Sequence, residues 1–142
     1  MKEAIQTLLK SDKMAHAFEY LKQDEAHTID QQIELVQISS FSPFEEKRAI
    51  RFKELLTEAG LDPVMDEVHN VYAHIHGTGN GPTLYVSAHL DTVFPPETPL
   101  PVKREGTKIY APGIGDDTRG LAEILTLARA IKESGLKPVG DI

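Results

Sequence analysis

The sequence predicts an α/β fold in which helices flank a mixed, mostly parallel sheet that is incomplete at its C-terminal end. Apolar residues recur at helical spacing through the first sixty residues, strand-like segments follow between residues 64 and 88, and one more helical pattern precedes the end of the chain. The chain has 142 residues, of which 40% are hydrophobic and 26% charged. This composition is that of an ordinary globular protein.

The N-terminal part of the chain predicts helices. Apolar residues at helical spacing mark segments 5–9 and 14–21. Thr28 and Gln31 have the spacing of a capping box, which predicts that a third helix begins there.

The start of a fourth helix is predicted at Ser42 and Pro43. Ser42 is a suitable cap, Pro43 suits the first helical position, and Glu45 is spaced to reach back to the Ser42 amide. Gly60 is expected to end this helix in the left-handed conformation.

The pattern then changes to strands. Segments 64–68 and 70–76 are predicted strands, and the glycine-rich residues 77–82 are a turn. Residues 83–88 form the most apolar strand, which we expect inside the sheet. Residues 102–110 predict a hairpin.

The C-terminal pattern is a helix over Thr118 to Ser134, closed by Gly135, with a new strand expected after Pro138. A strand–helix unit without its returning strand leaves the sheet half covered, so we expect the chain to be a fragment.

The charge distribution narrows the classes of partner. The formal net charge is −7, which disfavours nucleic acid because that ligand needs a basic surface. Residues 61–100 hold five acids and no Lys or Arg, which could suit a cation.

No apolar stretch reaches the ~18 residues of a membrane span, and the N-terminus does not resemble a secretory signal, so we expect a cytoplasmic protein.

The first motif that carries chemistry follows the apolar strand at residues 83–88. Ligands of open α/β sheets bind beyond the carboxyl ends of strands, where His89 and Asp91 lie. A carboxylate two residues after the histidine could accept its second ring N–H, fix the tautomer and improve the free nitrogen as a metal ligand. A surface histidine beside a turn aspartate is the alternative.

The second motif is the glycine-rich loop 113–120. Its adjacent acids, Asp116 and Asp117, repel one another unless a cation or hydrogen-bond donors hold them. One alternative is an aspartate that only caps the next helix. Another is a phosphate loop, although the glycine spacing departs from the dinucleotide fingerprint.

Together the two motifs resemble the N-terminal part of the M20 family of metallopeptidases. The pattern Ser-Ala-His-Leu-Asp-Thr-Val, then Gly-Ile-Gly-Asp-Asp-x-x-Gly-x-Ala, carries the resemblance, which runs from about Ile29 to Ile142. It implies that His89 is a ligand of one metal, that Asp116 bridges two metals, and that Asp91 orients His89 as part of the catalytic apparatus. It also suggests a cis peptide bond between Asp116 and Asp117. Arg119 departs from the family's common glycine.

The resemblance implies an enzyme that uses two zinc ions, with cobalt or manganese as substitutes, to cleave small peptides or N-acyl amino acids. It predicts a Glu-Glu pair, further ligands and a lid domain beyond Ile142, and it allows a homodimer of the full-length protein. On this reading residues 1–28 are a helical extension and residues 29–142 are the first part of the catalytic domain. We expect this chain alone to bind metal weakly and to be inactive, since a catalytic zinc keeps three protein ligands.

Two alternatives come from other classes. The chain could be a non-catalytic α/β binding module in which His89 and Asp116 are incidental, or a nucleotide-binding domain. Separately, His74 and His76 share one face of a predicted strand. They could chelate a metal or be partly exposed side chains of a sheet face.

Overall fold

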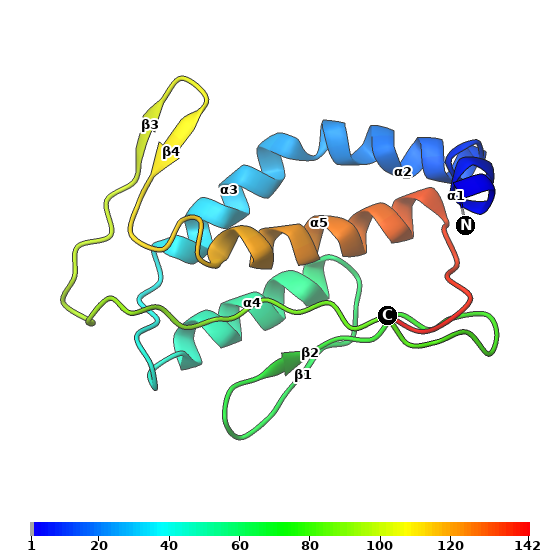
Figure 1. Cartoon of the computed structure of the whole chain (residues 1–142). Helices are drawn as coiled ribbons and strands as arrows, with labels where there is room; N and C mark the ends of the chain where they lie inside the picture. The colour runs from blue at the N-terminus through cyan, green and yellow to red at the C-terminus, as the bar shows by residue number, and fades with distance from the viewer. Residues whose placement is uncertain (1) are drawn as a thin grey trace.

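The computed structural model describes residues 2–142, and helices make up most of its regular structure (Figure 1). The five helices are α1 (Lys2–Leu9), α2 (Asp12–Gln23), α3 (Glu25–Val36), α4 (Glu46–Glu58) and α5 (Thr118–Ser134). Helix α5 lies between the α2–α3 pair and α4, and contacts all three. The core cluster comes from α3, α4 and α5, and consists of Leu35, Phe52, Leu55, Leu56, Leu121 and Leu125.

Helix α5 has the predicted bounds because both of its ends carry strong local signals. The Asp117 side chain accepts a hydrogen bond from the Gly120 amide at 3.1 Å, which is the contact of an N-terminal cap. Gly135 has a φ of 63°, the left-handed conformation that closes a helix. Gly60, with a φ of 86°, follows α4 in the left-handed conformation that was predicted for it.

Two predicted helix starts are wrong. Helix α3 begins at Glu25 rather than at Thr28, whose hydroxyl instead donates to Asp24. Helix α4 begins at Glu46, because the preceding residues form a separate turn in which the Phe44 amide donates to the Phe41 carbonyl. This turn places Phe41 beside Thr92 in a parallel bridge, a distant contact that the local capping pattern does not reveal.

The strands are shorter than predicted and their ladders are antiparallel. Strand β1 (Val64–Met65) pairs with β2 (Val71–Tyr72), and β3 (Lys103–Glu105) pairs with β4 (Lys108–Tyr110) in the predicted hairpin. The fold is therefore mixed α/β, but the expected mostly parallel sheet is not formed within residues 2–142. Parallel pairing among the described residues consists of the single bridge between Phe41 and Thr92.

The apolar segment 83–88 is not part of a ladder. Parallel strands need a neighbour brought alongside by a crossover, and in the described chain only residues near the C-terminus approach, where the Leu84 amide donates to the Asp141 carbonyl. Leu84, Tyr85 and Val86 are consequently exposed. At the C-terminal end of this segment, Ala88 and the following Leu90 pack against the core cluster.

The C-terminal segment 138–142 lies between residues 75–79 and Leu84. Ile75 and Ile142 exchange two backbone hydrogen bonds of 2.8 and 3.0 Å, and Thr78 and Gly79 donate to Pro138 and Val139. Gly140 is required at this crossing, since a methyl group on it would overlap the Pro82 carbonyl.

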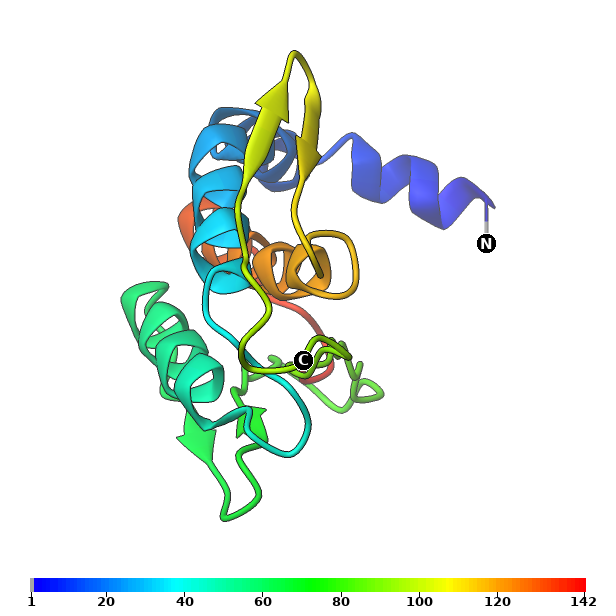
Figure 2. The same ribbon diagram turned by 90° about the vertical axis from the view of Figure 1, so that its left-hand side faces the viewer.

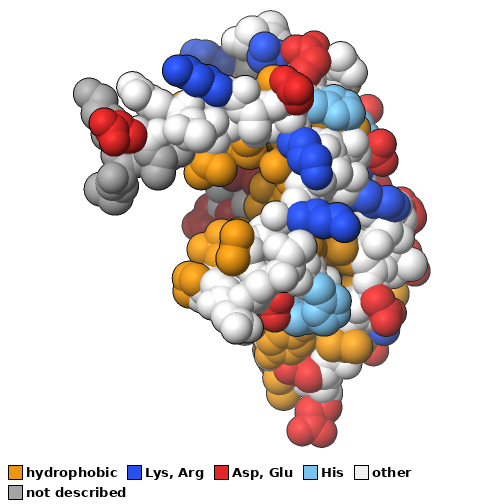
Figure 3. All heavy atoms as spheres, turned by 90° about the vertical axis from the view of Figure 1, so that its right-hand side faces the viewer, with side chains coloured by type: hydrophobic (Ala, Val, Ile, Leu, Met, Phe, Trp, Pro, Cys, Tyr) orange, Lys and Arg blue, Asp and Glu red, His pale blue; other side chains and the backbone are white. Residues whose placement is uncertain are grey.

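Helix α1 projects from the rest of the molecule (Figure 2). Its predicted apolar stripe does not pack into the core, because Ile5, Leu8 and Leu9 are all exposed. Figure 3 shows further hydrophobic side chains on the surface at this end of the molecule. Within the described residues, none of the helices is long and apolar enough to cross a membrane.

Candidate functional site

The two predicted motifs meet in space around His89. Its Nε2 atom lies 2.8 Å from a carboxylate oxygen of Asp116, and its Nδ1 atom lies 3.1 Å from a carboxylate oxygen of Asp91. The imidazole therefore bridges two carboxylates from different loops, with Asp116 lying 27 residues after His89 in the chain. This is the arrangement in which one carboxylate fixes the histidine tautomer and leaves the other ring nitrogen to face a ligand.

Asp116 and Asp117 have different surroundings although they are neighbours. The Asp117 carboxylate accepts hydrogen bonds from the Gly120 amide and from the His89 amide, the latter at 3.2 Å. The Asp116 side chain is 91% exposed and contacts His89. The peptide bond that joins them is cis, as the family resemblance predicted. Asp117 thus has a structural role, and Asp116 presents its oxygens to the site.

The pKa of His89 is raised above its usual 6.5 by its neighbours. Partial burial alone would lower this pKa, but the contact with Asp116 and the charges of Asp91 and Asp117 outweigh that effect. Without a metal ion the positive charge of the imidazolium is balanced by carboxylates. A cation at the same place would be balanced by the same groups.

A buried arginine fixes the loop that holds His89 and Asp91. Arg48 is only 1% exposed, and its guanidinium donates to the Ile38 carbonyl and, at 2.8 Å, to the Leu90 carbonyl. Burial lowers the pKa of Arg48 to about 10, and the nearby Asp91 opposes this effect.

Ser40 strengthens the same loop from the other side. Its hydroxyl donates to the Leu90 carbonyl at 2.8 Å, and its own carbonyl accepts from the Thr92 amide at 2.7 Å. The sequence analysis missed both residues. Arg48 carried a usable signal, since it lies four residues before Phe52 on the buried face of α4.

A hollow of about 300 Å³ opens beside the histidine. It is lined by His89, by residues 91–94, by Ala111 and by residues 113–116. The donor set that faces it, one imidazole nitrogen and one exposed carboxylate, suits a zinc ion, which accepts both kinds of ligand. The three predicted site residues, His89, Asp91 and Asp116, are therefore brought together.

Comparison with known proteins gives matches to one family. Residues 85–142 match the family model for peptidase family M20/M25/M40. Over 75 residues the chain is 39% identical to carboxypeptidase G2 of Pseudomonas sp. strain RS-16, covering 51% of this chain and 18% of that protein. Over 92 residues it is 38% identical to a candidate LysW-lysine/LysW-ornithine hydrolase of Pyrobaculum aerophilum, covering 65% of this chain and 26% of that protein.

A solved structure shows the same likeness. The crystal structure of a tripeptidase from Staphylococcus aureus superposes with a TM-score of 0.68 at 31% identity, over 83% of this chain and 35% of that one. The chain spans about a third or less of the length of the relatives that it matches. The predicted resemblance is confirmed: the chain is similar to M20 peptidases, with the family match over residues 85–142.

Proposed function

We propose that this chain forms the first part of the catalytic domain of a metal-dependent hydrolase that cleaves peptide or N-acyl amide bonds. The observation that carries the proposal is the bridge from Asp91 through His89 to Asp116. The names of the relatives, a carboxypeptidase, a tripeptidase and a hydrolase of lysine and ornithine conjugates, support the same kind of reaction and a small peptide-like substrate.

The roles of the three residues follow from their contacts. Asp91 accepts a hydrogen bond from Nδ1 of His89, so Nε2, which donates to Asp116 when no metal is bound, is the nitrogen that would lose its proton and bind an ion beside the hollow. His89 and Asp116 then supply two ligands to zinc, with cobalt or manganese as substitutes. When bound, such an ion supplies a Lewis acid that polarises the substrate carbonyl and activates water.

The same geometry leads us to expect little metal affinity in the 142-residue chain. A catalytic zinc keeps three protein ligands, and this site offers two. We propose that the remaining ligands and the general base belong to a longer cytoplasmic protein, in which residues 1–28 are a helical extension. In that protein a Glu-Glu pair is expected soon after Ile142.

The test uses the protein at its full natural length, assayed on a tripeptide and on an N-acyl amino acid. We expect activity that a chelator removes and added zinc restores. His89→Ala should abolish activity, while His16→Ala, which changes an exposed histidine of α2, should leave it unchanged. Activity that survives both chelation and His89→Ala would reject the proposal. Zinc-independent binding of a nucleotide, with no hydrolysis, would favour a nucleotide-binding domain.

A further inference from the structure

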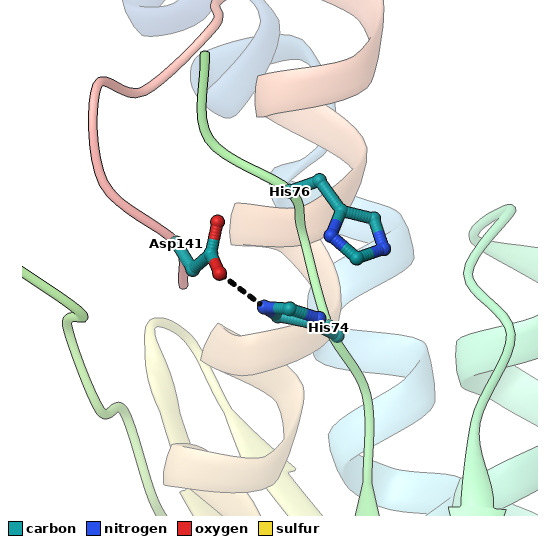
Figure 4. A group of neighbouring side chains, drawn as sticks. All are labelled: His74, His76 and Asp141. Atoms are coloured by element: carbon teal, nitrogen blue, oxygen red, sulfur yellow. Dashed lines mark ion pairs between the residues drawn. The ribbon is translucent and has the colours of Figure 1, made fainter. Parts of the chain in front are cut away.

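A second group of metal-binding side chains lies outside the site around His89. It consists of His74, His76 and Asp141, and it shares no residue with that site. Figure 4 shows both histidines on one extended segment, with His74 pointing toward Asp141 of the C-terminal segment and the His76 ring on the other side of the His74 ring. Each residue offers a ligand atom, and these atoms lie within 4.8 Å of one another.

The backbone explains why these three side chains meet. Ile75 and Ile142 exchange two hydrogen bonds, the pattern of an antiparallel hydrogen-bonded pair. In that register Asp141 lies opposite His76 and diagonal to His74, all on one face. Ala73 lies on the other face, where it packs against the core cluster. The backbone therefore brings these side chains together and exposes them to solvent on the face away from the helices.

The aspartate is held in place by two contacts. One carboxylate oxygen accepts a hydrogen bond of 2.7 Å from the Gly77 amide, and the other lies 3.0 Å from Nε2 of His74. The His76 ring stands edge-on to the His74 ring, with ring centroids 4.2 Å apart. The ion pair between His74 and Asp141 explains the position of the His74 ring. It does not explain why the His76 ring lies against the His74 ring.

We propose that His74, His76 and Asp141 form a second zinc-binding site, separate from the site around His89. Two imidazoles and one carboxylate are ligands that zinc prefers, with bonds of about 2.0–2.2 Å and a fourth position left for water. The ligand atoms lie within 4.8 Å of one another, so rotation of the exposed His76 side chain is needed to bring all three onto one ion. Residues 61–100, which carry the two histidines, contain no Lys or Arg.

A zinc ion here ties two distant parts of the chain together. It joins the extended segment 74–77 to residues 140–142, where the Asp141 carbonyl also accepts a hydrogen bond from the Leu84 amide. We therefore expect zinc to raise the melting temperature of the chain, because a ligand that binds only the folded state stabilises it.

The experiment first removes the other candidate site with the double substitution His89→Ala and Asp116→Asn. Zinc is then titrated into this variant of the 142-residue chain against a chromophoric chelator, and the histidine ring signals are followed by NMR. We expect one zinc ion per chain, with shifts of the His74 and His76 signals and none of the His16 signal.

The ligands are tested individually in the same background. His74→Ala, His76→Ala and Asp141→Asn should each weaken zinc binding about 10-fold or more and remove the rise in melting temperature. His16→Ala is the matched control and should change neither. Should the double substitution prevent folding, the same NMR titration of the unsubstituted chain reports the two sites separately through His89 on one hand and His74 and His76 on the other.

Two results would overturn this proposal. One is a folded background variant that binds no zinc. The other is zinc binding that His74→Ala and His76→Ala leave unchanged. Neither result tests the hydrolase proposal, because that proposal depends on His89 and Asp116.

Discussion

His89 contacts a carboxylate through each of its ring nitrogens, and these two contacts have different consequences. Nδ1 faces Asp91, the group proposed to orient the ring, while Nε2 faces Asp116 beside the hollow. Sequence reasoning found all three residues because each stands in a short motif. It could not find their distances, which depend on how two loops meet.

The first prediction concerns Asp91. Asp91→Asn removes the carboxylate that orients His89, so zinc affinity at this site should fall about 10- to 100-fold, the usual effect of losing such a partner. Isothermal titration of the full-length protein with zinc measures it. Asp62→Asn removes the same charge from an exposed residue and should have no effect. Equal affinity of Asp91→Asn and the parent protein would show that His89 needs no orienting group.

The second prediction concerns protonation of His89 in the absence of metal. Contact with Asp116 raises the pKa of this imidazole, so Asp116→Asn should lower it. Since the folded-state pKa is raised, the stabilising contribution is present below the unfolded pKa and is lost as pH rises through the folded value. NMR titration of the histidine ring signals, with His16 as internal reference, gives the pKa of His89 in the parent chain and in Asp116→Asn. An unchanged His89 pKa in the variant would contradict the contact.

At the scale of elements, capping residues in the sequence predicted the helix ends that are fixed by contacts between neighbouring residues. Helix α5 begins and ends where the Asp117 cap and Gly135 indicate. Helix α4 does not begin at its capping pattern, because the turn before it is held by a contact between Phe41 and Thr92, fifty-one residues away. The segment 83–88 has the composition of a buried strand, but pairing requires a neighbour that composition does not supply.

The third prediction tests the link between α4 and the site. Arg48→Met leaves the Ile38 carbonyl without its donor and the Leu90 carbonyl with the Ser40 hydroxyl alone. A buried unsatisfied acceptor costs about 1–3 kcal/mol, so we expect the free energy of unfolding to fall by about that amount, together with weaker zinc binding at His89. Urea denaturation and zinc titration measure the two effects. Lys47→Met, at an exposed neighbouring position, should change neither.

At the scale of the whole molecule, one buried ion pair joins the N-terminal helices to α5. Asp24, at the junction of α2 and α3, accepts hydrogen bonds from Arg129 at 2.6 Å and from Thr126 at 2.7 Å. Gln31 accepts from the same arginine. Sequence reasoning gave these helices their apolar faces but missed this polar network, because its members lie about one hundred residues apart and match no short motif.

The fourth prediction follows from this network. Burial alone would raise the pKa of Asp24, but hydrogen bonds from Arg129 and Thr126 and the arginine's charge lower it below 3.8. Its stabilising contribution is therefore present above the unfolded pKa and is lost as pH falls through the folded value. Asp24→Asn should reduce the free energy of unfolding by about 3–5 kcal/mol at neutral pH.

The pH dependence separates this effect from a general loss of packing. The difference between the parent chain and Asp24→Asn should shrink as urea denaturation is repeated at pH values below about 4. Asp62→Asn serves as the exposed control. A difference that stays constant down to the acid-unfolding range would mean that the carboxylate's charge contributes nothing.

The crossing at Gly140 has a consequence for the order in which the chain is built. Ile75, Thr78 and Leu84 find their backbone partners in residues 138–142, which the ribosome makes about sixty residues later. Helices α2 to α4 can pair with one another as they emerge, whereas the extended segments must wait with unpaired amides until synthesis has passed α5. Until then the Leu84 amide lacks its partner, and it lies among apolar residues, 84–86, that are exposed in the folded chain as well and are open to non-native contacts.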